Sequence, residues 1–314
     1  MTTLDLSIVI PCYNEGKNVY LLFGMLKKTL LSLKKSYEII YIDDGSTDDT
    51  GIFLDRIKKL DPSHVIILKM RKNFGQTAAF DAGFSHAKGR LIITLDADLQ
   101  NDPADIPLLI DKLHKGYDVV CGWRYDRKDP LMKTMISRVA NALRKFLTKE
   151  TIHDSGCSLR VYKRECVEGL TLYGEMHRFI PAILMWKGFK IGEVKVHHHP
   201  RTYGKTKYTA KRVLKGLLDV IVVKFWMQYS SRPMHLFGTI GFVTSFLGFV
   251  IGVYLAILKF VYHATIGSRP LLLLAVLLII IGVQFVMFGI FGDILVKTYY
   301  ESKKEKNYLI EKIE

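Results

Sequence analysis

The chain has 314 residues, of which 49% are hydrophobic, and this content excludes a disordered protein and permits a sizeable core. It carries 45 Lys and Arg against 30 Asp and Glu, and the net charge of +15 predicts an anionic partner such as nucleic acid, a phosphorylated substrate or acidic lipid. The four cysteines have no C-x-x-C spacing, which argues against a zinc site and a disulfide framework and favours a reducing compartment.

The first part of the chain alternates short apolar runs with helical patterns. The runs that we expect to form strands are residues 4–10, 38–42, 64–69, 91–95 and 118–121, and the helical patterns cover 16–33, 49–60, 75–87 and 104–115. This alternation predicts an α/β fold, with a mostly parallel sheet and helices on both faces. The amino terminus, MTTLDLSIVI, lacks a basic n-region and is expected to be a strand rather than a signal peptide.

Three of the predicted strands run directly into acidic loops. These loops are PCYNEG (11–16), DDGSTDDT (43–50) and DADLQNDP (96–103). Parallel strands end at one edge of a sheet, so we expect the loops to meet there. Asp96, Asp98 and Gln100 alternate in an extended segment and offer hard oxygen ligands, which suit Mg²⁺ or Mn²⁺ on a nucleotide diphosphate. The alternative is a loop in which Asp98 and Asn101 only cap a helix that begins near Pro103.

The last third contains two uncharged apolar stretches, 236–258 and 271–292, and each is long enough to cross the roughly 30 Å of hydrocarbon in a bilayer. The link KFVYHATIGSRP is short, so the stretches predict a transmembrane hairpin with both ends on one side. Lys and Arg are more frequent beside the hairpin than in the link, which predicts a cytoplasmic amino-terminal domain and cytoplasmic termini. The predicted divisions are residues 1–207, 208–232, 233–296 and 297–314.

Two further segments, 131–147 and 208–232, combine apolar positions at helical spacing with Lys and Arg beside them. This pattern is typical of amphipathic helices that lie in the membrane interface. The alternative is that each helix simply packs on the domain.

Eight motifs follow one another along the chain. They are V-I-P-C-Y-N-E, D-D-G-S-T-D, R-K-N-F-G-Q-T-A-A, D-A-D-L-Q, G-W-R-Y, H-D-S-G-C-S-L-R, E-M-H-R-F and R-T-Y-G-K-T-K-Y. In this order they resemble the family 2 glycosyltransferases of GT-A fold, and within them the polyprenyl-phosphate sugar transferases of dolichol-phosphate mannosyltransferase and undecaprenyl-phosphate glucosyltransferase type. The resemblance covers about residues 5–208 and extends into the two-helix anchor. It implies inverting transfer of a sugar from a UDP- or GDP-sugar to undecaprenyl or dolichyl phosphate.

The resemblance also implies roles for individual residues in binding the donor. The nucleotide would be bound by Pro11, Tyr13, Glu15, either Asp43 or Asp44, and Asp96. The divalent cation, Mg²⁺ or Mn²⁺, would be held by Asp96, Asp98 and Gln100.

For catalysis, the resemblance implies phosphate contacts for Arg124 and Arg138, and a position near the acceptor for Asp154, with Asp98 acting through the metal. The segment RTYGKTKYTAKR, residues 201–212, matches a loop that related enzymes carry over the active site. Its Arg201 and Lys205 are therefore expected to close onto the donor diphosphate and the lipid phosphate. The alternative is a flexible basic linker attracted to acidic lipid.

Departures from the family pattern narrow the expected reaction. No E-D pair occurs, so the acidic base of many relatives is missing. A lipid phosphate needs no such base, because it is largely a dianion at neutral pH and can attack the anomeric carbon directly. The segment H-D-S-G-C-S-L-R differs from the T-S-G-F-R of the dolichol enzymes, which argues against a mannose donor. Q-x-x-R-W is also absent, which argues against a processive polysaccharide synthase.

The sequence is also compatible in part with two other classes of function. The charge is compatible with nucleic-acid binding, but no binding motif accompanies it and the basic residues adjoin the membrane segments, so we expect acidic lipid and no nucleic acid. A non-catalytic membrane component is disfavoured by the intact D-A-D-L-Q, and a homo-oligomer is compatible with the sequence. The tract 197–199 is expected to be a strand end rather than a metal site, while Trp123 and Trp226 either mark the membrane interface or fill the core.

Overall fold

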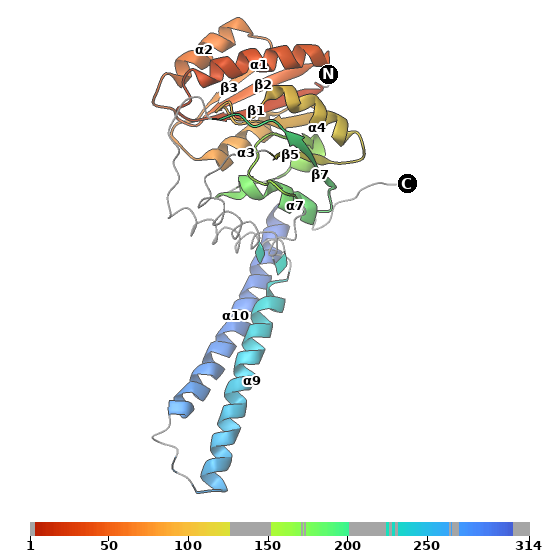
Figure 1. Ribbon diagram of the computed structural model, residues 1–314. Helices are drawn as coiled ribbons and strands as arrows, with labels where there is room; N and C mark the ends of the chain where they lie inside the picture. Colours follow the sequence, from red (N-terminus) through yellow and green to blue (C-terminus); the bar gives the residue numbers. More distant parts are fainter. Residues whose placement is uncertain are drawn as a thin grey trace. The chain divides into compact units, whose positions relative to one another are not determined.

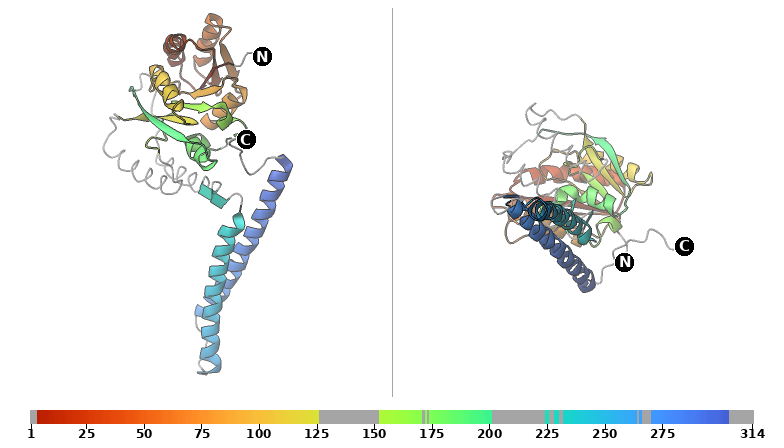
Figure 2. Two further views of the ribbon diagram at one scale, coloured as in Figure 1. Left: turned by 90° about the vertical axis from the view of Figure 1, so that its right-hand side faces the viewer. Right: turned by 90° about the horizontal axis from the view of Figure 1, so that it is seen from below.

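The computed structural model describes residues 4–125, 152–170, 172, 174–200, 224–225, 228–229, 232–263, 265 and 270–303. The chain divides into two compact units, Met1–Val223 and Lys224–Glu314, each described by itself (Figures 1 and 2). The predicted interfacial helix at 131–147 lies outside the described residues, as does almost all of the one at 208–232.

The described part of the first unit forms a seven-stranded sheet in the order β3-β2-β1-β4-β6-β5-β7. The strands are β1 Leu6–Cys12, β2 Tyr37–Asp43, β3 Val65–Lys69, β4 Leu91–Thr94, β5 Val119–Arg124, β6 Arg160–Lys163 and β7 Ile191–Val196. All pairs are parallel except those of β6, which runs antiparallel to β4 and β5. The predicted mostly parallel sheet is therefore confirmed, whereas neither β6 nor β7 was among the five predicted strands.

Helices cover both faces of this sheet (Figure 1). They are α1 Asn18–Leu33, α2 Thr50–Leu60, α3 Gln76–His86, η1 Pro103–Asp105, α4 Ile106–Leu113, α6 Arg164–Val167, η2 Met176–Phe179 and α7 Ile180–Trp186. Apolar residues of α1, α2 and α4 share one core with alternate residues of β1, including Ile8 and Ile10. On the other face, Gly83 of α3 packs against Val9 and Ile42. Strands that are apolar on both faces are expected where helices cover both sides.

The second unit contains two long helices, α9 Pro233–Phe260 and α10 Pro270–Lys303. Pro233–Phe260 and Pro270–Thr298 are long and apolar enough to cross a membrane. They approach closely at small residues: a Cβ atom on Gly241 would lie 2.5 Å from the carbonyl oxygen of Gly282, and one on Gly248 would lie 2.7 Å from that of Ala275. Small residues allow such backbone contact between membrane helices. The predicted pair of long apolar helices is confirmed.

The packing of α3 generates a prediction about two glycines. In Gly83→Ala the new methyl group would press on Val9, with Ile42 Cδ1 at 3.0 Å, so we expect the variant to lose about 1–3 kcal/mol of stability. Gly24→Ala is the matched control, because Gly24 is exposed on α1 with nothing within 4 Å of the added Cβ. Here the better helix propensity of Ala should stabilise by up to about 1 kcal/mol.

Thermal unfolding of the detergent-solubilised chain measures both effects. The midpoint should fall for Gly83→Ala and stay level or rise for Gly24→Ala. Equal shifts of the two midpoints would show that α3 does not pack on the sheet this tightly.

Candidate active site

The acidic loops meet at one edge of the sheet, as predicted, because β1, β2 and β4 are parallel and each ends where its loop begins. The first two loops bind each other directly. The backbone N–H of Asp44 donates to the Cys12 carbonyl at 2.9 Å, and that of Asn14 donates to Ser46 Oγ at 3.0 Å. The Thr47 N–H donates in turn to Asn14 Oδ1 at 2.8 Å. The loops therefore form one hydrogen-bonded rim.

Glu15 lies on this rim between α1 and α2. Its backbone N–H donates to Thr50 Oγ1 at 2.9 Å, and Asn18 Nδ2 donates to Glu15 Oε2 at 2.8 Å. The Thr50 hydroxyl itself donates to Asp48 Oδ1 at 2.5 Å. The first turns of both helices thus fix the backbone and the carboxylate of Glu15. The other predicted nucleotide contacts of this loop, Pro11 and Tyr13, fall at the end of β1 and directly after it.

Asp43, the last residue of β2, and Asp44, which follows it, have different partners. Asp44 is buried, and its oxygens accept the backbone N–H groups of Phe74 at 2.7 Å and Gly75 at 2.9 Å. Asp43 Oδ1 accepts the N–H of Ser46 at 2.9 Å. Gly75 has a φ of 94°, which favours glycine at this turn. Asp44 therefore stabilises the loop before α3, while Asp43 stabilises the loop that follows β2.

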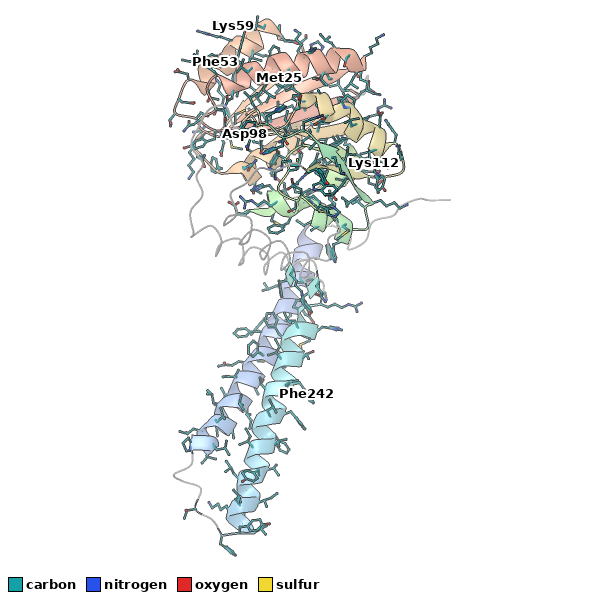
Figure 3. All side chains as sticks on the ribbon, in the orientation of Figure 1. Met25, Phe53, Lys59, Asp98, Lys112 and Phe242 are labelled. Atoms are coloured by element: carbon teal, nitrogen blue, oxygen red, sulfur yellow. The ribbon has the colours of Figure 1, made fainter. Side chains whose placement is uncertain are left out.

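Asp96 and Asp98 follow β4 and lie close enough to affect each other's charge. Gln76 Nε2 donates to Asp96 Oδ1 at 2.7 Å, and Asp98 is buried (Figure 3). Burial, followed by the negative charge of Asp98, raises the pKa of Asp96 to about 6. Leu99 turns the chain with a φ of 62°, and the N–H of Gln100 donates to Asp98 Oδ1 at 3.2 Å. The loop thus concentrates negative charge at the end of one strand.

This donor set fits a divalent cation that is shared with a substrate. Carboxylates are the ligands that Mg²⁺ and Mn²⁺ prefer, and a cation would relieve the repulsion that raises the pKa of Asp96. Within the ranges that the structure describes, no group of three His, Cys, Asp or Glu side chains is arranged to enclose a metal. Mg²⁺ sites that act on phosphates commonly use one or two carboxylates and take their other ligands from substrate and water.

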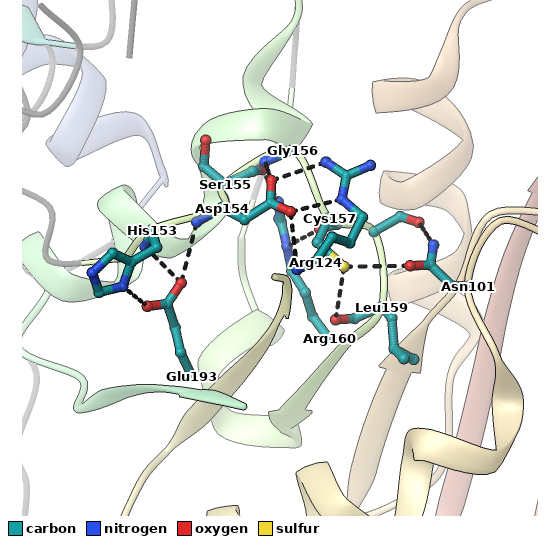
Figure 4. Close-up of polar contacts among 11 residues, drawn as sticks. Asn101, Arg124, His153, Asp154, Ser155, Gly156, Cys157, Leu159, Arg160 and Glu193 are labelled. Carbon is teal, nitrogen blue, oxygen red and sulfur yellow. Dashed lines mark hydrogen bonds and ion pairs between the residues drawn. The ribbon is translucent and has the colours of Figure 1, made fainter. Parts of the chain in front are cut away.

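Arg124 and Asp154 form a two-pronged ion pair beside this loop (Figure 4). Arg124 Nε donates to Asp154 Oδ2 at 2.6 Å and Nη2 donates to Oδ1 at 2.9 Å, with side-chain exposures of 12% and 9%. Burial opposes the charge of Arg124, but the hydrogen bonds and charge of Asp154 outweigh it and raise the pKa of the guanidinium. The Gly156 N–H also donates to Asp154 Oδ1, at 3.1 Å. Charge-assisted pairs of this geometry are rigid.

A second set of hydrogen bonds joins the loop after β4 to the Asp154 loop. Asn101 Nδ2 donates to Ser158 Oγ at 2.9 Å, and the same Oγ accepts the backbone N–H of Asp96 at 3.2 Å. The Cys157 thiol donates to Asn101 Oδ1 at 3.4 Å (Figure 4). The structure therefore brings Asp96 and the Asp154 loop together, although about 60 residues separate them in sequence. Burial raises the pKa of the Cys157 thiol to about 12, so the thiol stays protonated and Cys157 acts as a packing residue.

The remaining predicted site residues, Arg138, Arg201 and Lys205, lie outside the described residues. The tract 197–199 continues from β7 and pairs with the loop after β4: the His199 N–H donates to the Gln100 carbonyl at 2.9 Å, and His198 forms an antiparallel bridge with Asn101.

Sequence reasoning did not predict three residues that contact the site. Gln76 follows β3 at the same edge of the sheet, so its position after a strand could have indicated that it contacts the site. Ser158 lies inside a recognised motif, H-D-S-G-C-S-L-R, but carried no signal of its own. Glu193 carries no local signal, because its contacts with His153 and Asp154 depend on the pairing of β5 with β7.

Comparison with known proteins gives relatives over nearly the whole chain. Residues 7–171 match the family described as glycosyl transferase family 2. The chain is 39% identical over 315 residues to dodecaprenyl-phosphate galacturonate synthase of Rhizobium johnstonii, covering 99% of this chain and 93% of the relative. It is 34% identical over 308 residues to undecaprenyl-phosphate 4-deoxy-4-formamido-L-arabinose transferase of Klebsiella pneumoniae, covering 98% and 93%.

Solved structures share the fold of the first unit. Glucosyl-3-phosphoglycerate synthase of Mycobacterium tuberculosis, in complex with Mn²⁺, UDP and glucosyl-3-phosphoglycerate, superposes with a TM-score of 0.54 and 15% identity, covering 70% of this chain and 80% of that one. The same enzyme with Mg²⁺ and UDP gives a TM-score of 0.53 at 17% identity, covering 69% and 79%. The predicted GT-A-like fold is confirmed.

The raised pKa of Asp96 predicts how stability depends on pH without metal. Between pH 4 and about 6 the folded state holds a proton that the unfolded state releases, so the free energy of unfolding should fall as pH rises through this window. A shift of about two units corresponds to up to about 3 kcal/mol. Asp96→Asn should remove this slope and be more stable than the parent above about pH 6.

Denaturant unfolding in EDTA at several pH values measures the slope. Asp111→Asn, which changes an exposed carboxylate on α4, is the matched control and should keep the parent's pH dependence. If Asp96→Asn also keeps the parent's pH dependence, burial and the charge of Asp98 do not raise the pKa of Asp96.

Proposed function

Since the chain belongs to glycosyltransferase family 2, we propose that it transfers a sugar from a nucleotide-sugar to the phosphate of a membrane polyprenyl phosphate. The observation that carries the proposal is the paired carboxylates Asp96 and Asp98 at the sheet edge, in a chain whose near-full-length relatives are named as polyprenyl-phosphate sugar transferases. The two apolar helices suit an enzyme whose acceptor stays in the bilayer. The resemblance seen in the motifs is confirmed by the family match.

The donor nucleotide would lie along the rim formed by the first two loops. Pro11, Tyr13 and Glu15 would contact base and ribose, and the hydrogen bonds of Asn18 and Thr50 hold Glu15 for this role. Of the two candidates at the end of β2, Asp43 would be the better base contact, because both oxygens of Asp44, the residue after the strand, already accept backbone N–H groups. Either a UDP- or a GDP-sugar is compatible with this rim.

The donor diphosphate would meet Asp96, Asp98 and Gln100 through a divalent cation, Mg²⁺ or Mn²⁺. When bound, such a cation supplies positive charge that stabilises the leaving nucleoside diphosphate. Gln76 and Ser158 orient Asp96 for this contact. The glucosyl-3-phosphoglycerate synthase structures contain Mn²⁺ or Mg²⁺ together with UDP, and this supports the choice of ion.

The acceptor phosphate would attack the anomeric carbon itself, with inversion. Asp154 is occupied by Arg124 and by the N–H of Gly156, so its role is to hold the guanidinium in place for a phosphate rather than to accept a proton. A phosphate monoester is largely a dianion above about pH 6 and needs no base. Catalysis would then consist of aligning two anions and neutralising their charge.

Three cations outside the described residues complete the proposed site. Arg138 would bind phosphate beside Arg124. Arg201 and Lys205 would close over the bound donor from the segment that follows the tract 197–199. The proposed orientation keeps the catalytic unit and both termini in the cytoplasm, since Lys and Arg concentrate on that side of the helix pair.

Metal dependence tests the role of the paired carboxylates. Asp98→Asn should lower transfer by about 100-fold or more, and EDTA should abolish activity until Mg²⁺ or Mn²⁺ is returned. Transfer of labelled sugar into the organic phase measures both effects. Asp55→Asn, on the exposed surface of α2, is the control and should retain activity. Full activity of Asp98→Asn in EDTA would contradict the proposal.

Acceptor choice tests the proposed function itself. Labelled UDP- and GDP-sugars are offered with undecaprenyl phosphate, dolichyl phosphate and the matching free alcohols, and label in the organic phase is counted. We expect transfer to a phosphate only, at a rate that falls below about pH 6 as the acceptor takes up its second proton. Comparable transfer to a free alcohol would mean that a protein base exists and that the reaction is a different one.

The proposed loop closure is tested by Arg201→Ala and Lys205→Ala. A catalytic lid loses kcat even in detergent with saturating acceptor, because its cations neutralise the transferring groups. A linker that is only attracted to acidic lipid loses membrane affinity and keeps kcat. Lys28→Ala, an exposed lysine on α1, is the control for the loss of one positive charge.

A further inference from the structure

Four exposed or half-exposed side chains gather where β5 and β7 lie side by side, and we call them the aromatic–basic cluster: Trp123, Tyr125, His153 and Lys195. The rings of Trp123 and Tyr125 meet edge to face at 5.3 Å, and His153 stacks on Trp123 at 4.4 Å with an interplanar angle of 15°. The ammonium of Lys195 lies 3.9 Å from the centre of the Tyr125 ring and 5.5 Å from that of Trp123.

Strand alternation sets this cluster apart from the catalytic pair. Trp123 and Tyr125 flank Arg124, so their side chains leave the sheet on the face opposite to Arg124. Lys195 is the register partner of Trp123 on β7, which stands at one end of the order of described strands. The cluster therefore lies at the outer edge of the sheet, next to the candidate active site but not inside it.

The cluster is held in place although it is exposed. Glu193 accepts the backbone N–H of His153 at 2.6 Å, and its other oxygen lies 2.7 Å from His153 Nδ1. Tyr125 is nevertheless 63% exposed, and both His153 and Lys195 are exposed. An ordered set of aromatic rings and cations that still faces solvent requires an explanation other than core packing.

Sugar binding does not explain the cluster well. An aromatic platform for a sugar needs an open ring face, whereas the indole of Trp123 has His153 stacked on it and Lys195 near its ring. The side chains instead combine apolar rings with polar tips and positive charge. Trp and Tyr of this kind concentrate at the headgroup level of bilayers, where Lys meets anionic lipid.

We propose that the aromatic–basic cluster is the surface by which the catalytic unit rests on anionic phospholipid headgroups. Charge continuity supports this partner: Tyr125 leads directly into residues 126–149, which carry seven Lys or Arg against two Asp, and β7 leads into the basic segment 201–215. The chain also carries two helices able to cross a membrane, so lipid is always within reach.

The contact has a consequence for the neighbouring site. Arg124 lies between Trp123 and Tyr125 in the chain, and Asp154 follows His153. Lipid bound to the cluster therefore restrains the two backbone segments that carry the Arg124–Asp154 ion pair. A polyprenyl phosphate headgroup moves at the same level as the phospholipid headgroups, so this surface places the ion pair at the depth of the acceptor phosphate.

The fluorescence of Trp123 in the full-length chain tests whether the aromatic–basic cluster contacts lipid. Trp186→Phe with Trp226→Phe leaves Trp123 as the sole tryptophan of the three. The protein is placed in phosphatidylcholine vesicles with or without about one third phosphatidylglycerol, and a lipid carrying a nitroxide on its headgroup acts as quencher. We expect the nitroxide lipid to reduce Trp123 emission about two-fold in the anionic vesicles and less in neutral ones. Lys195→Glu should remove the difference.

The control variant carries its fluorophore on the opposite face of the sheet. In a chain whose three tryptophans are changed to Phe, Leu60→Trp places the fluorophore on α2, beside a hollow of about 460 Å³ lined by Tyr20, Phe53, Arg56, Lys59 and Leu60. This variant should be quenched by aqueous iodide and not by the nitroxide lipid. The proposal is overturned if Trp123 is quenched only by iodide, if Leu60→Trp is quenched by lipid as strongly as Trp123, or if Lys195→Glu changes nothing. The quenching measurement does not require sugar transfer. A negative quenching result would therefore overturn the lipid contact without bearing on the proposed reaction.

Discussion

The burial of Asp96 beside a second carboxylate, Asp98, is the constraint on which the candidate active site depends. Asp96 would be hard to keep ionised there, since both burial and the charge of Asp98 raise its pKa. The surrounding structure offsets part of this cost: Gln76 donates to Asp96, and the positive charges of Arg124 and Arg160 act against the shift. Gln76 begins α3, whereas Arg124 and Arg160 lie on β5 and β6. Because β6 and then β5 follow β4 in the sheet order, the sheet brings these two arginines near the loop after β4.

The partly uncompensated negative charge of this loop supports the proposed binding of a divalent cation. A pair of carboxylates that was already neutralised by lysines would have little affinity for a metal, whereas partial compensation leaves negative charge for a divalent ion to remove. Rigid support matters as well, because Ser158 and Asn101 tie the loop to the Asp154 segment and limit its freedom before any ligand arrives. Pre-organisation of this kind lowers the cost of ordering the site on binding.

Much of this architecture could be predicted from local pattern, and the rest could not, for physical reasons. The five predicted strands and four predicted helices begin and end close to the observed ones, because apolar runs are interrupted by Gly and by acidic loops. The strand β6, with the sequence RVYK, is too short and too polar to show a period, and it exists because β4 and β5 supply hydrogen bonds on both sides. Position after a strand revealed the acidic loops, but the roles of Ser158 and Glu193 depend on contacts that only the folded chain creates.

The hydrogen bonds of Asp154 say more about its part in the proposed reaction than the motif H-D-S-G-C-S-L-R, in which it lies. An acid predicted to lie near the acceptor is a natural candidate for a general base, yet protonation of Asp154 would weaken its ion pair with Arg124 and its hydrogen bond from Gly156. Breaking a mostly buried charge pair costs several kcal/mol, commonly about 3–5, which would add to the barrier that a base is meant to lower. A nucleophile that arrives already charged avoids this cost. The engaged state of Asp154 and the missing E-D pair thus independently support the proposed acceptor chemistry, attack by a phosphate rather than by a hydroxyl group.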